Sequence, residues 1–300
     1  MANQSLNSII LILFLLVVFC SSSTVIASEH GTIRVGGSAE SIYEIKTSDV
    51  EIVFTLLFNE MFKDLDEQFA IKIYDTDADL ALNVSKRNLD VVFTNTTHFL
   101  EIEDHLRSNA FFAVRHGTSI KPKIFLLVRK DSGIAQLKQL RNKKIAIPTG
   151  HNVGELFLDV ELLRLGLPIS ENYFSEIRRS KESNAAIVNL FFGQVDAALV
   201  TEFSFDVAGE LNQQIFRDLV VLTSSDPLVH MVISVHKDFP LHRVDNIFKR
   251  LEGIEKTPRL MYLTKTFHFQ GVHQIQNDDI CEVRQLKDEF RRLLNGHEMP

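Results

Sequence analysis

Two stretches of the sequence, residues 81–99 and 186–205, present the same chemical types in the same order. Each begins with an apolar helical pattern and a turn, continues with an apolar residue, an aspartate and a strand, and ends in hydroxyl-bearing side chains. The two aspartates are Asp90 and Asp196. Such internal similarity favours two alike α/β lobes. Because helix–turn–strand units are common in all α/β proteins, one large domain stays the alternative.

The segments around these stretches alternate between strand and helix patterns. Short apolar or alternating runs predict strands, and apolar pairs four to five residues apart predict helices. We expect strands at residues 32–35, 69–74, 89–93, 144–147 and 195–200, and helices at 49–62, 78–84, 154–165 and 185–192. This order predicts mainly parallel sheets with helices on their faces.

Further patterns suggest that the chain passes between the lobes twice. Strands are expected at residues 125–128, 219–222 and 230–235, and C-terminal helices at 243–254 and 280–294. A crossing near residues 120–126 and a return near 224–231 would join the lobes by two crossing strands. The first lobe is then residues 28–122 plus 228–300, and the second is residues 123–227.

The N-terminal segment has a different composition from the rest of the chain. Residues 1–28 contain no Asp, Glu, Lys or Arg, and residues 9–20 are all apolar. As a helix, this run would cover about 18 Å, too short for a membrane core of ~30 Å. Small or apolar residues precede a cut after Ala27, which predicts a signal peptide at residues 1–27 and a periplasmic location. Since no Lys or Arg precedes the apolar run, an uncleaved anchor is the alternative.

Composition excludes several classes of protein. Apolar residues make up 45% and charged residues 24%, as in folded soluble proteins. A net charge of −7 disfavours a general nucleic-acid binder. Two cysteines are too few for a disulfide scaffold, and removal of the signal peptide would leave Cys281 alone. Catalytic serine, nucleotide-loop and paired-histidine motifs are missing from the sequence, so we expect no enzyme, no cofactor and no metal.

Three motifs carry a resemblance to a known family. They are residues 130–134 (KDSGI), 137–146 (LKQLRNKKIA) and 192–198 (FGQVDAA). In this order they resemble the phosphate/phosphonate-type periplasmic solute-binding proteins of ABC transporters, over roughly residues 32–240 and most strongly over 114–200. The resemblance implies a type II periplasmic-binding-protein fold, in which two lobes close on a ligand. His151 and Asn152 stand where the family usually has hydroxyl donors, which widens the expected ligand to any small polar or anionic solute.

Four loops follow predicted strands at the edge where ligands bind in open α/β sheets. The loop after residue 148 opens a helix, whose free N–H groups suit an anion, although Thr149 or Asn152 could simply cap that helix. The loop after residue 93 could equally be an ordinary turn, and the two glutamates could be solvated loop residues. The candidate ligand-binding residues are Ser38, Glu40, Thr94, Asn95, Thr96, Thr149, His151, Asn152, Thr201 and Glu202.

These observations predict an exported, monomeric solute-binding protein that delivers its ligand to an ABC permease. Two alternatives remain. The protein could instead be a ligand-sensing subunit that regulates a membrane sensor, such as a histidine kinase or a diguanylate cyclase. An enzyme on the same fold is the third hypothesis, and the absence of a recognisable nucleophile–base pair argues against it.

Overall fold

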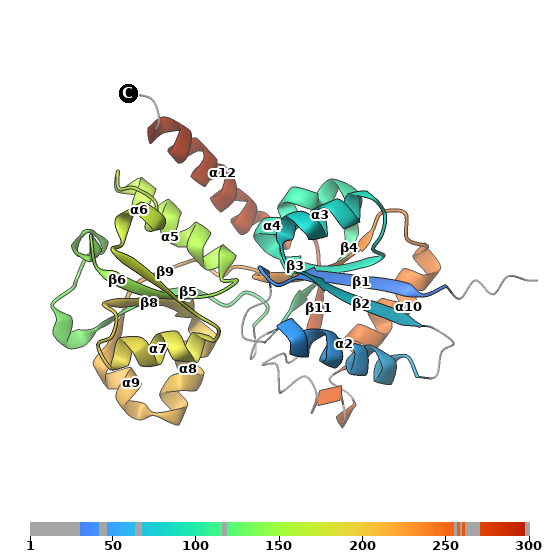
Figure 1. Ribbon diagram of the computed structural model, residues 1–300, viewed down its shortest axis with the longest axis horizontal. Helices are drawn as coiled ribbons and strands as arrows, with labels where there is room; N and C mark the ends of the chain where they lie inside the picture. The colour runs from blue at the N-terminus through green and yellow to red at the C-terminus, as the bar shows by residue number, and fades with distance from the viewer. Residues whose placement is uncertain are drawn as a thin grey trace, which may run out of the picture. The chain divides into compact units, whose positions relative to one another are not determined.

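The computed structural model contains two β-sheets flanked by helices (Figure 1). The structure describes residues 31–41, 47–63, 68–115, 119–254, 257–258, 260–261 and 271–297. The predicted signal peptide, residues 1–27, lies outside these ranges. The predicted α/β class with two sheet-centred lobes is confirmed.

The first sheet has the strand order β11-β4-β10-β3-β1-β2. Its strands are β1 (Ile33–Ser38), β2 (Phe69–Tyr74), β3 (Val91–Asn95), β4 (Leu106–Val114), β10 (Met231–His236) and β11 (Val272–Ile275). Its helices are α2 (Thr47–Met61), α3 (Asp77–Ser85), α4 (Thr96–Ile102) and α10 (Leu241–Glu252). The sheet therefore combines segments from both ends of the described chain.

The second sheet has the order β7-β6-β8-β5-β9 and uses only the middle of the chain. Its strands are β5 (Ile124–Arg129), β6 (Lys144–Pro148), β7 (Glu176–Ser180), β8 (Ala197–Thr201) and β9 (Leu219–Ser224). Its helices are α5 (Asn152–Arg164), α6 (Ser170–Tyr173), α7 (Ser183–Phe191), α8 (Glu202–Leu211) and α9 (Gln213–Asp218). The last helix, α12 (Cys281–His297), follows β11.

Both sheets are mixed rather than mainly parallel. In the first sheet β1 pairs in parallel with β2 and β3, whereas β10 runs antiparallel to β3 and β4. In the second sheet β6 pairs in parallel with β7 and β8, whereas β5 runs antiparallel to β8 and β9. A strand that enters a sheet at the carboxyl ends of its parallel strands must run against them.

The register places both crossings at the carboxyl ends of the parallel strands. Met231, the first residue of β10, lies opposite Asn95, the last residue of β3. Ile124, the first residue of β5, lies opposite Thr201, the last residue of β8. The chain thus passes between the sheets at the edges where the predicted ligand loops lie. The lobe boundaries at residues 122 and 228 stay a prediction.

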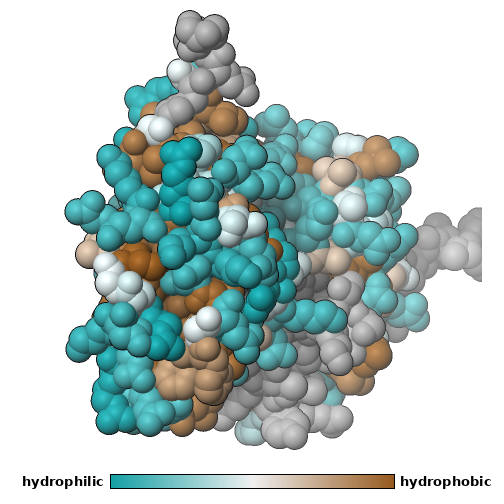
Figure 2. Space-filling model, turned by 60° about the vertical axis from the view of Figure 1, so that its left-hand side comes forward, coloured by the Kyte–Doolittle hydropathy of each residue, from teal (hydrophilic) through white to brown (hydrophobic). Residues whose placement is uncertain are grey.

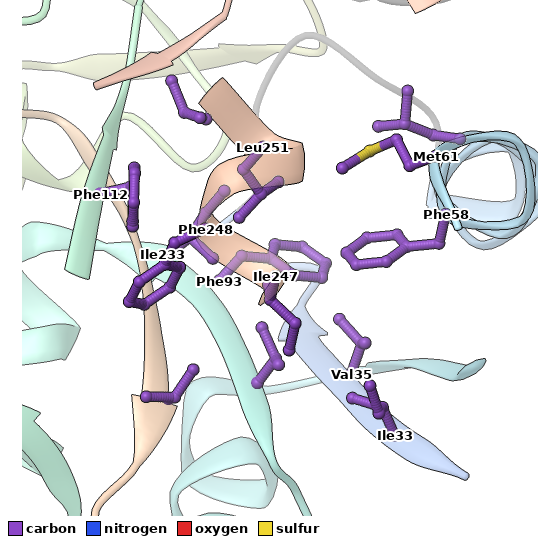
Figure 3. Packing of buried hydrophobic residues seen from close by; sticks show 14 of the residues in the cluster. Ile33, Val35, Phe58, Met61, Phe93, Phe112, Ile233, Ile247, Phe248 and Leu251 are labelled. Carbon is purple, nitrogen blue, oxygen red and sulfur yellow. The ribbon is translucent and has the colours of Figure 1, made fainter. Parts of the chain in front are cut away.

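Each face of each sheet is covered by its own hydrophobic cluster. In the first sheet, α2 and α10 pack on one face and α3 and α4 on the other. Figure 3 shows Phe58 of α2 and Ile247 of α10 in one cluster with Phe93 of β3. In the second sheet, α5 and α12 cover one face and α7, α8 and α9 the other.

Asp90 and Asp196, the aspartates of the repeated stretches, occupy equivalent places. An Asp90 carboxylate oxygen accepts the backbone N–H of Arg34 at 2.9 Å, and the Asp90 N–H donates to the Arg34 carbonyl at 2.8 Å. An Asp196 carboxylate oxygen accepts the N–H of Lys144 at 2.8 Å, and the Asp196 N–H donates to the Lys144 carbonyl at 2.9 Å. Each aspartate thus ties the start of β3 or β8 to the start of β1 or β6, which is a structural role.

Asp90→Ala is expected to lower the free energy of unfolding by about 2 kcal/mol, because it leaves the Arg34 N–H and guanidinium without their acceptor. Burial opposes ionisation of Asp90, but the Arg34 hydrogen bonds prevail and lower its pKa. Asp196→Ala is the matched variant and should cost about 1 kcal/mol, since only one backbone N–H loses its acceptor. Urea unfolding measures both. Equal losses would contradict the assigned role of the Arg34 side chain.

Candidate functional site

A polar network lies at the carboxyl ends of the first sheet's parallel strands, around Asp77. The hydroxyl groups of Ser38 and Ser41 both donate to Asp77 Oδ1, the second at 2.7 Å. Ser41 Oγ also lies 2.9 Å from Thr94 Oγ1. Ser38, Ser41 and Thr94 are buried. Since the two serine protons point at a carboxylate, this edge offers hydrogen-bond acceptors more readily than donors.

Asn95 and Thr96 hold the start of α4. The Asn95 side-chain oxygen accepts the His98 N–H at 2.9 Å, which caps the helix, and its amide donates to Ser41 Oγ at 2.7 Å. The Thr96 hydroxyl donates to the Val229 carbonyl at 2.6 Å. Both side chains are buried and engaged, so the loop is rigidly placed.

Glu40 and His98 flank the same network. Glu40 Oε2 accepts the Asp77 N–H at 2.8 Å, at the start of α3, so this acid is engaged at a helix N-terminus. His98 Nδ1 lies 3.0 Å from Thr94 Oγ1 and 3.4 Å from Asp77 Oδ1. Burial lowers the pKa of His98, which favours the neutral imidazole. Asp77 and Ser41 were not among the candidates, although Ser41 is the last residue of a predicted loop.

His151 lies in the loop between β6 and α5 and turns inward. Its side chain is 2% exposed, and its ring centre is 5.8 Å from that of His230, which precedes β10. Burial, assisted by the nearby Arg179, lowers the pKa of His151 to about 4. A Cβ on Gly154 would meet the His151 ring at 2.7 Å, so glycine leaves room for this imidazole.

Thr149 and Asn152 are more accessible than His151. The Thr149 N–H donates to the Ser180 carbonyl at 2.7 Å, while its side chain is exposed. Asn152 is half-buried and begins α5, whose N-terminus has no side-chain cap. The N-terminus of α7 also lacks a side-chain cap. At the carboxyl edge of the second sheet, α5 and α7 therefore begin with first-turn N–H groups that no side chain caps.

Thr201 and Glu202 lie where β8 meets α8. The Thr201 hydroxyl oxygen accepts the Ser204 N–H at 3.2 Å and caps α8. The Glu202 N–H donates to the Lys123 carbonyl at 2.8 Å, beside the start of β5. Thr201 thus has a capping role, and Glu202 is half-buried next to it.

One cavity lies between three helices, α4, α5 and α12. It has a volume of about 420 Å³ and contacts Thr97 of α4, Asn152 of α5 and Lys287 of α12. Phe290 and Leu156 supply apolar wall, and Glu101, Glu155, Asp159 and Arg291 supply charge. Asn152 is the only sequence candidate among the described residues that line it. Nothing in the local sequence around Lys287 indicated its place there.

The face of the molecule drawn in Figure 2 is mostly polar. Most of the coloured atoms in Figure 2 are hydrophilic, with hydrophobic atoms in small patches. Within the described ranges, no helix has both the length and the hydrophobicity that crossing a membrane requires.

A family model described as the periplasmic substrate-binding protein of phosphonate ABC transporters matches residues 46–280. The chain belongs to this family. It is therefore a phosphonate-type periplasmic substrate-binding protein of the ABC-transporter class. This family is a transport family and not an enzyme family. The resemblance to phosphonate-type binding proteins is thereby confirmed, and the family implies an exported location. No curated protein matches the sequence significantly.

Solved structures agree with the fold of this binding protein. A binding component of an ABC phosphonate transporter from Pseudomonas aeruginosa superposes with a TM-score of 0.66 at 11% identity, covering 90% of each chain. PhnD1 from Prochlorococcus marinus, solved with methylphosphonate, gives 0.64 at 14% identity, covering 88% of this chain and 98% of that chain. XAC2383 from Xanthomonas citri, solved with ATP, gives 0.65 at 14% identity with the same coverage. At these identities the likeness concerns the fold alone.

Proposed function

We propose that this protein captures a small solute between the carboxyl edges of its two sheets and delivers it to an ABC permease. The carrying observation is the cavity between α4, α5 and α12, which is lined by Thr97, soon after the end of β3, and by Asn152, soon after the end of β6. A solute held by both loops would favour a closed arrangement of the lobes over an open one. No finding favours the alternative of a sensor subunit.

The two edges suggest complementary chemistry in the ligand. The second edge has the uncapped N-termini of α5 and α7, which favour an oxyanion. The first edge is organised around the Asp77 carboxylate, which favours a hydrogen-bond donor. We therefore propose a ligand with an oxyanionic group and a donor group, and the methylphosphonate complex of PhnD1 supports phosphonates as the first class to test.

A thermal-shift screen tests this proposal. The probes are methylphosphonate, an aminoalkylphosphonate, inorganic phosphate, sulfate and an aliphatic sulfonate. At a concentration 100 times the Kd, a ligand adds about 2.7 kcal/mol to the free energy of unfolding, which is easily measured. Failure of every probe to raise Tm would contradict the proposed oxyanion class.

The double variant Thr149→Ala/Asn152→Ala should lose the ligand-induced rise in Tm and keep the Tm of the free protein. The reason is that Thr149 is exposed and Asn152 is half-buried, so little packing is lost. Gln213→Ala/Gln214→Ala, two exposed positions on α9, is the matched control and should retain the rise. A large fall in the free protein's Tm with binding retained would mean that Thr149 and Asn152 contribute to folding rather than to binding.

A further inference from the structure

Helix α12 belongs to the first sheet by sequence and to the second by packing. It follows β11, the edge strand of the first sheet, through a 3₁₀ turn at Asn277–Ile280. Yet Val283 is fully buried in the cluster that contains Leu158 and Leu162 of α5. In Figure 1, α12 is the red helix beside α5. A single helix therefore contacts elements of both sheets.

The contacts of α12 with α4 and the turn that follows it include two ion pairs. Arg284 makes two hydrogen bonds to the Glu103 carboxylate, at 2.6 and 2.8 Å. Lys287 Nζ donates to Glu101 Oε1 at 2.7 Å and to the Thr97 carbonyl at 2.8 Å. On the other side, Arg164 of α5 binds the Glu289 carboxylate at 3.0 and 2.7 Å.

Lys287 is the most constrained of these charges. Only 9% of the residue is exposed, and it lines the cavity that also contacts Asn152. Burying an ammonium group is costly, and the carboxylate partner of Lys287 compensates little, since 57% of the Glu101 side chain is exposed. Stability alone is therefore a weak reason for a lysine at this position.

A series of hydrogen bonds, joined through the residue Thr97, connects Lys287 to the polar network of the first sheet. Lys287 donates to the carbonyl of Thr97, and the Thr97 hydroxyl donates to Asn95 Oδ1. The Asn95 amide donates to Ser41 Oγ at 2.7 Å, and Ser41 donates to Asp77 at 2.7 Å. The ammonium group thus acts on the first turn of α4, directly behind the loop that would face the ligand.

We propose that Lys287 is a positioning residue of the ligand site, which holds the loop of residues 94–97 in place from a helix packed on α5. This inference rests on the proposed function, because it assigns Lys287 to the same site. The Lys287 ammonium group is engaged by the Thr97 carbonyl and by Glu101, so it acts through this loop and sets the position of Thr94, Asn95 and Thr96 relative to the α5 side of the cavity. Arg284 binds Glu103 in the turn after α4, outside this hydrogen-bond series, so it provides a matched control.

The test compares Lys287→Met, Lys287→Arg and Arg284→Gln with the unaltered full chain. Calorimetric titration with methylphosphonate measures affinity, and amide hydrogen exchange of the free protein measures the order of residues 95–98. Lys287→Met should weaken binding at least tenfold and speed exchange at these amides, with Tm nearly unchanged. Lys287→Arg, which keeps a charged donor, should restore affinity to within about threefold, and Arg284→Gln should bind like the unaltered chain.

Equal affinity loss in Lys287→Met and Arg284→Gln would overturn the proposal, since α12 would then act only as a general brace. Unchanged affinity and exchange in Lys287→Met would overturn it as well. If the unaltered protein binds no methylphosphonate, phosphonate binding fails, and the exchange of the free variants still decides the role of Lys287. Should Lys287→Met not fold, Lys287→Arg compared with Lys287→Gln supplies the same contrast between a charged and a neutral donor.

Discussion

Gly37→Ala should lower the free energy of unfolding by about 3 kcal/mol. A Cβ at this position would lie 2.2 Å from Cε2 and 2.4 Å from Cζ of the Phe93 ring. Phe93 has little room to move, because it is 3% exposed and stacks on Phe54 with ring centres 4.7 Å apart. Either the ring or strand β1 must shift, and close-packed interiors resist such shifts.

Urea unfolding followed by circular dichroism measures this loss. Gly296→Ala is the control, since an added Cβ there meets nothing within 4 Å and alanine favours the helix. The double variant Gly37→Ala/Phe93→Leu should recover part of the loss relative to the sum of the single variants, because a smaller side chain vacates the space. Simple additivity would show that the Phe93 ring is not the obstacle. Since Ser38 follows Gly37, ligand binding should fall together with stability.

The protonation of His151 alone should lower the free energy of unfolding by about 3 kcal/mol as the pH falls from 7 to below 4. Burial holds the pKa of His151 at about 4 in the folded chain, against 6.5 for the ordinary group. The neutral form is therefore favoured on folding, and unfolding takes up a proton between these values. The contribution is fully present above pH 6.5 and is lost as the pH falls towards 4, at up to about 1.4 kcal/mol per pH unit.

His151→Gln should flatten the dependence of unfolding free energy on pH between 6.5 and 4, as measured by urea unfolding at half-unit intervals. Some slope should remain, because burial also lowers the pKa of His98 and of His236. His273→Gln, at an exposed position, is the control and should leave the profile unchanged. A His151→Gln profile as steep as that of the unaltered protein would contradict the assignment.

Many of the strands and helices followed from local patterns, whereas β4, β7, β11, α4, α6, α8 and α9 were not expected. The helix expected at residues 49–62 spans Thr47–Met61, and the one expected at 154–165 spans Asn152–Arg164. Apolar spacing reports which face of a helix is buried, and this depends on neighbouring residues alone. The element β7 was missed because its sequence, EIRRS, has the charges of an edge strand and little apolar alternation.

The candidate site was predicted less completely than the fold. The loops after β3 and β6 were expected, and Thr97 in the first turn of α4 and Asn152 at the start of α5 line one cavity. His151 is buried against His230, 79 positions away by their numbers in the sequence, which loop chemistry could not indicate. The roles of the ten candidates in binding a ligand stay a prediction, since many of these polar groups bind one another or cap helices.

The sequence by itself determined the α/β class, the repeated unit with Asp90 and Asp196, and membership in a family of transport binding proteins. These properties are carried by short-range periodicity and by motifs whose residues are close in the chain. Only the tertiary structure decided that both sheets are mixed, that Asp77 gathers the hydroxyl groups of the first edge, and that Lys287 reaches Thr97 across 190 positions. The physical reason is that a hydrogen bond depends on distance in space, and packing of α12 on α5 brings that ammonium group to α4.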